Sequence, residues 1–342
     1  MENIQESLNK LKATLSSSSK EKIIGVSTTA DKSNPEIIFG SIRETRSTIS
    51  GTVILRDIGF LKEIIGCFDG VVDYFMLDPE YKNEVSNLET TVTNLIKKSK
   101  IFIYKPNDFT VDSLDMFVAL LFKSLQGKKV YIIGAGNIGS KIALKLCERG
   151  AHVSMYDNDI SKIQIIVGGL NYIKRSSTQI EVALNLSDGA QGADLIIGCT
   201  PGIPVITKEI ITVLNKGSKI IDAGNRTVFL DAIVEARVKG IEILSLSSLP
   251  GYIGMIENWL FQRELLQNKR IETVDGCSII VPGVLGLKGD ILVDNISKPT
   301  RIFGVCDGVG GLLSREEGMG FLGEYIAKNS IPSSIQGIVS LY

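Results

Sequence analysis

The stretch of sequence that decides the fold is KKVYIIGAGNIGSKIALKLCERGAHVSMYD, residues 128–157. Its apolar run 130–133 has the composition of a buried strand and leads into three closely spaced glycines. Apolar side chains then recur at helical spacing, at Ile138, Ile142, Ala143 and Leu146. A second apolar run ends at Asp157. A strand, a turn, a helix and a strand in this order predict a βαβ unit and a parallel sheet.

The glycines of this turn have the spacing G-x-G-x-x-G, which is typical of loops that hold a dinucleotide pyrophosphate. Gly134 permits the tight turn, Gly136 lets the backbone approach the pyrophosphate, and Gly139 lets the helix pack against the strand. The helix begins at Asn137 and Ile138, where free N–H groups favour phosphate binding. The motif therefore predicts a cofactor site at these five residues. The alternative is a domain of the same shape that has lost its nucleotide.

Asp157 ends the strand that follows the helix. A carboxylate at this position accepts hydrogen bonds from the adenine-ribose hydroxyls and repels a 2′-phosphate. No arginine follows it directly, so we expect NAD as the cofactor and NADP as the less favoured one.

Two further strand ends predict the other half of the site. The run ADLIIGCT (193–200) continues into Pro201 and Gly202, so Thr200, Pro201 and Gly202 are expected near the nicotinamide ribose. The run SKIID (218–222) is followed by Asn225 and Arg226, which we expect to contact substrate or nicotinamide. A guanidinium there could hold a substrate carboxylate. The alternative for Arg226 is a solvated loop charge.

Length and composition limit the remaining possibilities. The chain has 342 residues, enough for two domains at about 100–200 residues each. The 37 basic and 38 acidic residues leave a net charge of −1, which argues against a nucleic-acid or anionic-membrane partner. The single histidine, His152, and five cysteines without C-x-x-C spacing argue against a metal site. We interpret His152 as structural. Without a signal-like or membrane-length apolar run, we expect a cytoplasmic protein.

The expected fold is α/β, with the two-domain architecture of a dehydrogenase. Residues 1–110 would form an N-terminal α/β substrate and catalytic domain, and 111–126 a linking helix. Residues 127–250 would form a doubly wound Rossmann domain for NAD. Residues 251–342 would add a helix and a glycine-rich β segment that completes the site or forms an interface in a homo-oligomer, specifically a homodimer. In that segment, Asp307 and the glycines after it could form an anion nest or simple turns.

Hydride transfer to a C–O or C–N centre requires a proton partner. Because histidine is nearly absent, we assign this function to Lys105 and Asp108, at the end of the strand-like run IFIY. The alternative is that this segment is a turn in which Asp108 caps the following helix. Asp78 is a second strand-end candidate in a turn-like Asp-Pro context, and Arg43 could hold a substrate carboxylate or belong to a solvated charge cluster.

Several stretches resemble known NAD(P)-dependent families. LQGKKVYIIGAGNIGSKIALKLCERGAHVSMYDND resembles the cofactor domain of leucine- and glutamate-type amino-acid dehydrogenases. ADLIIGCTPGIPVITKEIITVLNKGSKIIDAGN resembles methylene-tetrahydrofolate dehydrogenases and S-adenosylhomocysteine hydrolase, and SSLPGYIGMIENWL is similar to the Pro-Gly segment of the folate enzymes. GNRTVFLDAIVEARVKG is similar to the arginine loop of D-2-hydroxyacid dehydrogenases, but the late histidine of that family is missing. The resemblance spans about residues 112–260 and implies the Rossmann-fold dehydrogenase superfamily.

These observations lead to one principal expectation. The chain would be an NAD-dependent oxidoreductase that transfers hydride between nicotinamide and an amino, imine, hydroxy or carbonyl centre of a small, carboxylate-bearing metabolite, as in amino-acid metabolism. One alternative is a hydrolase or lyase with tightly bound NAD that oxidises its substrate transiently. The other is an NAD(H)-sensing protein without catalytic activity.

Overall fold

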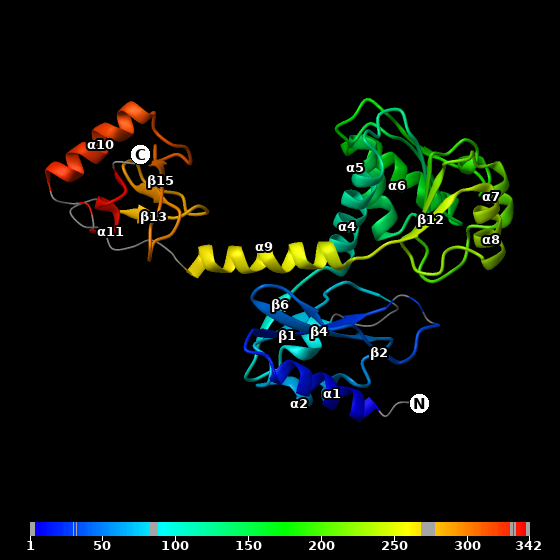
Figure 1. The fold of residues 1–342 in the computed structure, drawn as a ribbon, viewed down its shortest axis with the longest axis horizontal. Helices are drawn as coiled ribbons and strands as arrows, with labels where there is room; N and C mark the ends of the chain where they lie inside the picture. The colour runs from blue at the N-terminus through cyan, green and yellow to red at the C-terminus, as the bar shows by residue number, and fades with distance from the viewer. Residues whose placement is uncertain are drawn as a thin grey trace. The chain divides into compact units, whose positions relative to one another are not determined.

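The computed structural model describes residues 4–29, 31, 33–82, 88–267, 278–328, 331 and 333–339 (Figure 1). The chain forms two compact units, Met1–Gly254 and Met255–Tyr342. The boundary falls within helix α9 (Leu249–Gln267). Each unit is described by itself.

The N-terminal part of the first unit is a mixed sheet in the order β2-β4-β1-β5-β6, with β3 also paired to β4. The central strand β1 runs parallel to β4 and β5, and β5 runs parallel to β6. The short strands β2 and β3 are antiparallel to β4. The strand bounds are β1 (Glu21–Thr28), β2 (Ile37–Phe39), β3 (Arg43–Glu44), β4 (Thr48–Leu55), β5 (Tyr74–Leu77) and β6 (Lys100–Ile103).

Three helices contribute buried residues to the same apolar cluster as this sheet, namely α1 (Ile4–Ser16), α2 (Leu61–Phe68) and α3 (Leu88–Val92). The apolar side chains Leu8, Leu11 and Leu15 recur on one face of α1 and are buried. Leu11 lies so close to β4 that a side chain on Gly51 would be 2.5 Å from its Cδ1 atom. The glycine therefore lets α1 pack directly on the sheet, whose central strands are buried along most of their length.

The linking helix differs from its predicted bounds. Helix α4 spans Pro106–Leu121 rather than 111–126. Lys105 is extended and precedes Pro106 at the first helical turn, where a proline costs no hydrogen bond and its fixed φ favours the helix. The Pro-Asn-Asp segment that suggested a turn is therefore the first turn of α4. At the other end the backbone becomes extended at Phe122, well before Gly127.

The second sheet has the doubly wound order β12-β11-β10-β7-β8-β9, and its paired strands are parallel. Numbered along the chain, this order is 3-2-1-4-5-6, which defines the Rossmann fold. The predicted fold class is confirmed. The bounds are β7 (Lys129–Ile133), β8 (His152–Tyr156), β9 (Ile180–Val182), β10 (Leu195–Gly198), β11 (Lys219–Asp222) and β12 (Glu242–Ser245).

Helices α5 (Asn137–Glu148), α6 (Ile160–Ile173), α7 (Lys208–Val213) and α8 (Leu230–Lys239) cover this sheet (Figure 1), and a short 3-10 helix, η1 (Asp188–Ala190), lies between β9 and β10. One apolar cluster contains residues of α4, α5 and α6, and another contains residues of α7 and α8. Burial on both faces explains the nearly continuous apolar sequences of β7 and β10.

The second unit contains the small sheet β13 (Ile279–Ile280), β14 (Ile291–Val293) and β15 (Ile302–Val305), with α10 (Arg315–Ala327) and α11 (Ser333–Gln336). Ser314 and Glu317 form a capping box at the start of α10. Within the described residues, no helix is long and apolar enough to cross a membrane.

Candidate functional site

The glycine-rich loop follows β7, as predicted, and two of its glycines are required by the protein itself. Gly134 has a φ of +107°, and its N–H donates to the Tyr156 carbonyl at 2.8 Å. A Cβ atom on Gly139 would lie 1.9 Å from the Gly134 carbonyl oxygen, so α5 could not pack this close to the turn with any other residue. Turn geometry and helix packing account for these two positions.

Gly136 is different, because nothing in the protein requires a glycine there. Its φ of −78° and ψ of −166° suit any residue, and a Cβ atom would meet no atom within 4 Å. It is the N-cap of α5, where serine or aspartate would satisfy a free N–H group better than glycine does. The space beside its backbone is the cradle that a pyrophosphate would fill, next to the first-turn residues Asn137 and Ile138. The residues present therefore fit a dinucleotide.

Asp157 lies at the end of β8 and braces the loop. Its carboxylate accepts the Ala135 N–H at 2.8 Å and the Asp159 N–H at 3.2 Å. Burial alone would raise the pKa of Asp157, but these hydrogen bonds and the charge of Lys162 hold it below its usual value. Lys162 Nζ is 3.5 Å from the carboxylate. Sequence reasoning missed this cation, which lies in the first turn of α6, five residues beyond Asp157.

A cavity of about 370 Å³ lies at the carboxyl ends of β7, β8 and β10. Its lining includes predicted residues from all three strand ends, namely Gly134, Gly136, Asp157, Thr200 and Pro201. Lys162 and Cys199 also line it. Burial raises the pKa of the Cys199 thiol to about 12, so this cysteine is a neutral, apolar wall and not a nucleophile.

The loop after β11 carries Asn225 and Arg226, and both have a φ of +61°. Two successive left-handed residues that are not glycine are strained, and such strain concentrates at functional sites. Arg226 is 63% exposed, and its Nη2 pairs with Asp31 Oδ2 at 2.7 Å. Asp31 also lies against Gly202, since a Cβ atom there would be 2.3 Å from the Asp31 carboxylate. This pairing could not be predicted from the sequence, because Asp31 and Arg226 are far apart along the chain.

Lys105 and Asp108 lie together at the start of α4, with Lys105 Nζ 2.8 Å from Asp108 Oδ2. Lys141 of α5 pairs with the other carboxylate oxygen. Asp108 therefore does not cap the helix; Lys105 holds the N-cap position, and Asp108 connects α4 to α5. The hydrogen bond and charge of Asp108 raise the pKa of Lys105, which is 55% exposed. This pairing keeps Lys105 protonated at neutral pH.

The structure also brings together Asp78, Glu80 and Lys82 at the carboxyl end of β5. Lys82 Nζ lies 2.6 Å from Asp78 Oδ2 and 3.3 Å from Glu80 Oε2, and the three side chains are nearly buried. Sequence reasoning named Asp78 but treated it as part of a turn, and it missed Glu80 and Lys82. The spacing of Asp78 and Lys82 alone does not reveal that both are buried.

The other candidates lie outside this cavity. His152 is exposed on β8. Asp307 fills the glycine-rich turn that could have been an anion nest, since its own carboxylate accepts the N–H groups of Val309 and Gly311. In the described part of the chain, no three His, Cys, Asp or Glu side chains gather as metal ligands. The cysteine at 277 lies outside the described residues.

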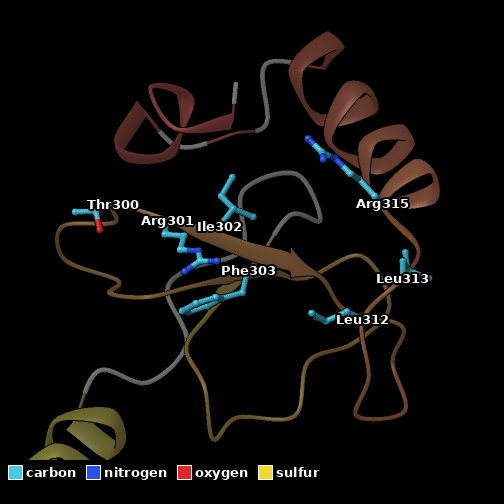
Figure 2. Close-up of a pocket in the computed structure, with 7 residues that line it drawn as sticks. All are labelled: Thr300, Arg301, Ile302, Phe303, Leu312, Leu313 and Arg315. Atoms are coloured by element: carbon cyan, nitrogen blue, oxygen red, sulfur yellow. The ribbon is translucent and has the colours of Figure 1, made fainter. Parts of the chain in front are cut away.

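The second unit has an open hollow of about 690 Å³ beside β15 and the start of α10 (Figure 2). Arg301 lies over the Phe303 ring, with 5.3 Å between the guanidinium carbon and the ring centroid. Arg315 also lines the hollow, from the first residue of α10. None of the predicted site residues contributes to it.

A family model of NAD(P)-binding domains matches residues 121–219. A search of the curated proteins found no match. The solved structures that are similar to this chain at low sequence identity include the following three. A 5-ketofructose reductase from Gluconobacter sp. strain CHM43 has 18% identity, covers 71% of this chain and 94% of that chain, and gives a TM-score of 0.40. A shikimate dehydrogenase solved with NADP+ has 12% identity, covers 71% of this chain and 90% of that chain, and gives a TM-score of 0.44.

The A chain of dipicolinate synthase from Bacillus subtilis has 13% identity, covers 73% of this chain and 97% of that chain, and gives a TM-score of 0.39. The family match extends from the end of α4 to the start of β11, so it includes the glycine loop, Asp157 and Thr200. Together with the strand order, it identifies this segment as an NAD(P)-binding domain of the Rossmann fold.

Proposed function

We propose that the chain is an NAD(P)-dependent oxidoreductase that acts on a small, polar metabolite. The observation that carries this proposal is Gly136 of the glycine-rich loop, where the fold does not require a glycine but a pyrophosphate close to the backbone would. A bound nicotinamide would supply or accept a hydride at the far end of the cavity, near Thr200, Pro201 and Gly202. The chain itself must bind the substrate and move the proton.

The substrate side of the proposal rests on charge. Arg226 extends from a strained loop close to the turn at Gly202, and a guanidinium can hold a carboxylate through two hydrogen bonds. We therefore propose a carboxylate-bearing substrate that contacts Asn225 and Arg226, with an amino, imine, hydroxy or carbonyl group as the reacting centre. Lys105 and Asp108 are the acid–base candidates that the sequence indicates, and Lys82 at the end of β5 is a second candidate.

For the cofactor we propose NAD before NADP, because Asp157 would repel a 2′-phosphate. Two features weaken this preference. The carboxylate already accepts two backbone hydrogen bonds, and Lys162 places a positive charge beside it. Measured affinities for NADH and NADPH will decide between the two cofactors.

A panel of amino, hydroxy and keto acids tests the function, with each acid incubated with NAD(H) or NADP(H) and followed by the absorbance of reduced nicotinamide. We expect turnover of at least one acid, and weaker cofactor binding by an Asp157→Ala variant. Dinucleotide binding without turnover of any acid would contradict the oxidoreductase proposal and favour a sensor. Tightly retained NAD without net reduction would favour the hydrolase or lyase alternative.

A further inference from the structure

Asp78, Glu80 and Lys82 form a nearly buried cluster of three charged side chains at the carboxyl end of β5. The side chains are exposed by 0%, 10% and 13%, and one ammonium lies between two carboxylates. Removing charged groups from water is unfavourable even when they are paired, and apolar residues of similar size would often serve stability as well. Buried charge clusters of this kind are typical of functional sites.

Glu80 is the least satisfied member of the cluster. Among the described residues, neither of its buried oxygens receives a hydrogen bond of normal geometry, although Lys82 is close. Burial raises the pKa of Glu80, the charge of Lys82 opposes this shift, and the charge of Asp78 adds to it. A carboxyl group that readily takes up a proton therefore lies beside the ammonium of Lys82.

The position of the cluster in the sheet is that of a ligand site. Asp78 follows β5, Tyr104 follows β6, and the Lys82 ammonium is 3.4 Å from the carbonyl oxygen of Thr28, the last residue of β1. Burial raises the pKa of Tyr104, and the nearby Asp78 charge adds to this effect, so the phenol is a neutral hydrogen-bonding group. Ligands of parallel α/β sheets bind outside the carboxyl ends of neighbouring strands.

Arg43 supplies a positive charge close to the same edge. Its guanidinium lies 4.6 Å from the centroid of the Tyr252 ring, and the Tyr252 hydroxyl bonds to Ser50 at 2.7 Å. Its charge also acts on Tyr104. Within the described parts of the chain, no carboxylate pairs with Arg43. An oriented, partly buried guanidinium without an anion is suited to a substrate carboxylate.

Contacts between the two sheets show that this edge is turned toward the cofactor domain. Asp31, which follows β1, meets Arg226 and Gly202 of the cofactor domain. Lys141 of α5 pairs with Asp108, and its charge also acts on Glu80. Because α5 begins at the glycine loop, the cluster lies close to the helix that would bind the pyrophosphate.

We propose that Lys82, rather than Lys105, is the acid–base residue of the oxidoreductase and that Asp78 and Glu80 position it. Arg43 binds the substrate carboxylate, while Asn225 and Arg226 contact the nicotinamide or another polar group of the substrate. This inference rests on the proposed function. In the direction of reduction, the substrate carbon accepts a hydride from the reduced nicotinamide, and the electron pair of the C=O or C=N bond moves to the heteroatom. Lys82 donates a proton to that atom, becomes a neutral amine, and regains a proton from water. Oxidation reverses each transfer.

The test compares Lys82→Met with Lys62→Met, a substitution at an exposed lysine of α2, using NADH and the panel acid that the wild type turns over fastest. We expect Lys82→Met to lower kcat by about 10²–10⁴-fold, the usual contribution of a general acid or base. Lys62→Met should retain kcat within a few-fold. NADH binding, followed by fluorescence, should be unchanged in both. Arg43→Gln should raise KM for the acid far more than it lowers kcat.

Lys82→Met leaves two buried carboxylates without a cation, which destabilises the fold. A second variant therefore distinguishes the loss of the acid–base group from the loss of folding. Lys82→Cys, alkylated with 2-bromoethylamine, restores an amine of nearly the same length and should recover much of the lost kcat with a shifted pH profile. A wild type that turns over no panel acid would defeat the proposed function itself. A wild type that is active while Lys82→Met keeps its kcat would overturn only the inference about Lys82.

Discussion

Gly136 offers the sharpest test of cofactor binding, because the fold and the ligand make opposite demands there. The φ and ψ of Gly136 lie in the extended region, and a Cβ atom would have open space. Serine is preferred over glycine at an N-cap by a few tenths of a kcal/mol. Replacing a glycine in a compatible conformation adds about 0.4–1 kcal/mol by restricting the unfolded chain.

We therefore expect Gly136→Ser to stabilise the protein without cofactor. A gain of about 0.5–1 kcal/mol raises Tm by about 1–4 °C in a unit of this size. The same side chain would occupy the space where the backbone meets the pyrophosphate, so the Kd for NADH should rise at least about tenfold, or about 1.4 kcal/mol. Thermal unfolding and NADH fluorescence titration measure the two effects separately.

Gly139→Ala is the matched control, because Gly139 belongs to the same motif but is required by helix packing and not by the ligand. Its Cβ atom would lie 1.9 Å from the Gly134 carbonyl oxygen, so the helix must shift and stability should fall by about 1–3 kcal/mol or more. That variant should lose stability and binding together, whereas Gly136→Ser should lose binding alone. If Gly136→Ser bound NADH as tightly as the wild type, the assignment of this loop to the pyrophosphate would be refuted.

Three further predictions follow from the charges around the cavity. Lys162→Gln should weaken NADPH binding more than NADH binding, by about 0.5–1 kcal/mol as expected for an exposed charge pair; equal losses in parallel titrations would contradict this. The pKa of Asp157 is lowered in the folded protein, so its contribution to stability is complete above its unfolded pKa of about 3.9 and is lost as the pH falls through the lower folded pKa. The free energy of unfolding, followed by circular dichroism, should therefore fall less steeply with decreasing pH in Asp157→Asn than in the wild type. Identical slopes would argue against a stabilising role of the Asp157 carboxylate. Asp31→Asn removes the partner of Arg226, so KM for a carboxylate substrate should fall severalfold if Arg226 binds it, and an unchanged KM would assign the substrate carboxylate elsewhere.

The parts of the site that could be predicted from sequence are those set by local backbone demands. The glycine spacing, the strand before it and Asp157 after it are all contained in about thirty residues, and each demand is local. The start of α4 was misjudged because Pro106 is equally compatible with a turn and with the first turn of a helix. Asp31 and Arg226 meet only through the tertiary fold, which a single sequence does not reveal.

Lys82 was missed for a different physical reason. A lysine between two carboxylates in a loop-like sequence is normally solvated, and only its burial distinguishes it. That burial depends on β1, β5 and β6 ending beside one another, since Thr28, Asp78 and Tyr104 come from three separate strands. Local spacing brings the three side chains together, and the sheet topology buries them.

The chemistry of the cofactor domain explains why the proton partner should come from the N-terminal sheet. Asp157 is committed to bracing the glycine loop, and Asp222 accepts the Thr227 hydroxyl at 2.9 Å. The Cys199 thiol is held neutral by burial, and the only histidine of the sequence, His152, does not line the cofactor cavity. The carboxylates of Asp157 and Asp222, at two strand ends of this domain, are thus both engaged in hydrogen bonds. We therefore expect the titratable groups at the edge of the neighbouring sheet to supply the proton in the proposed reaction.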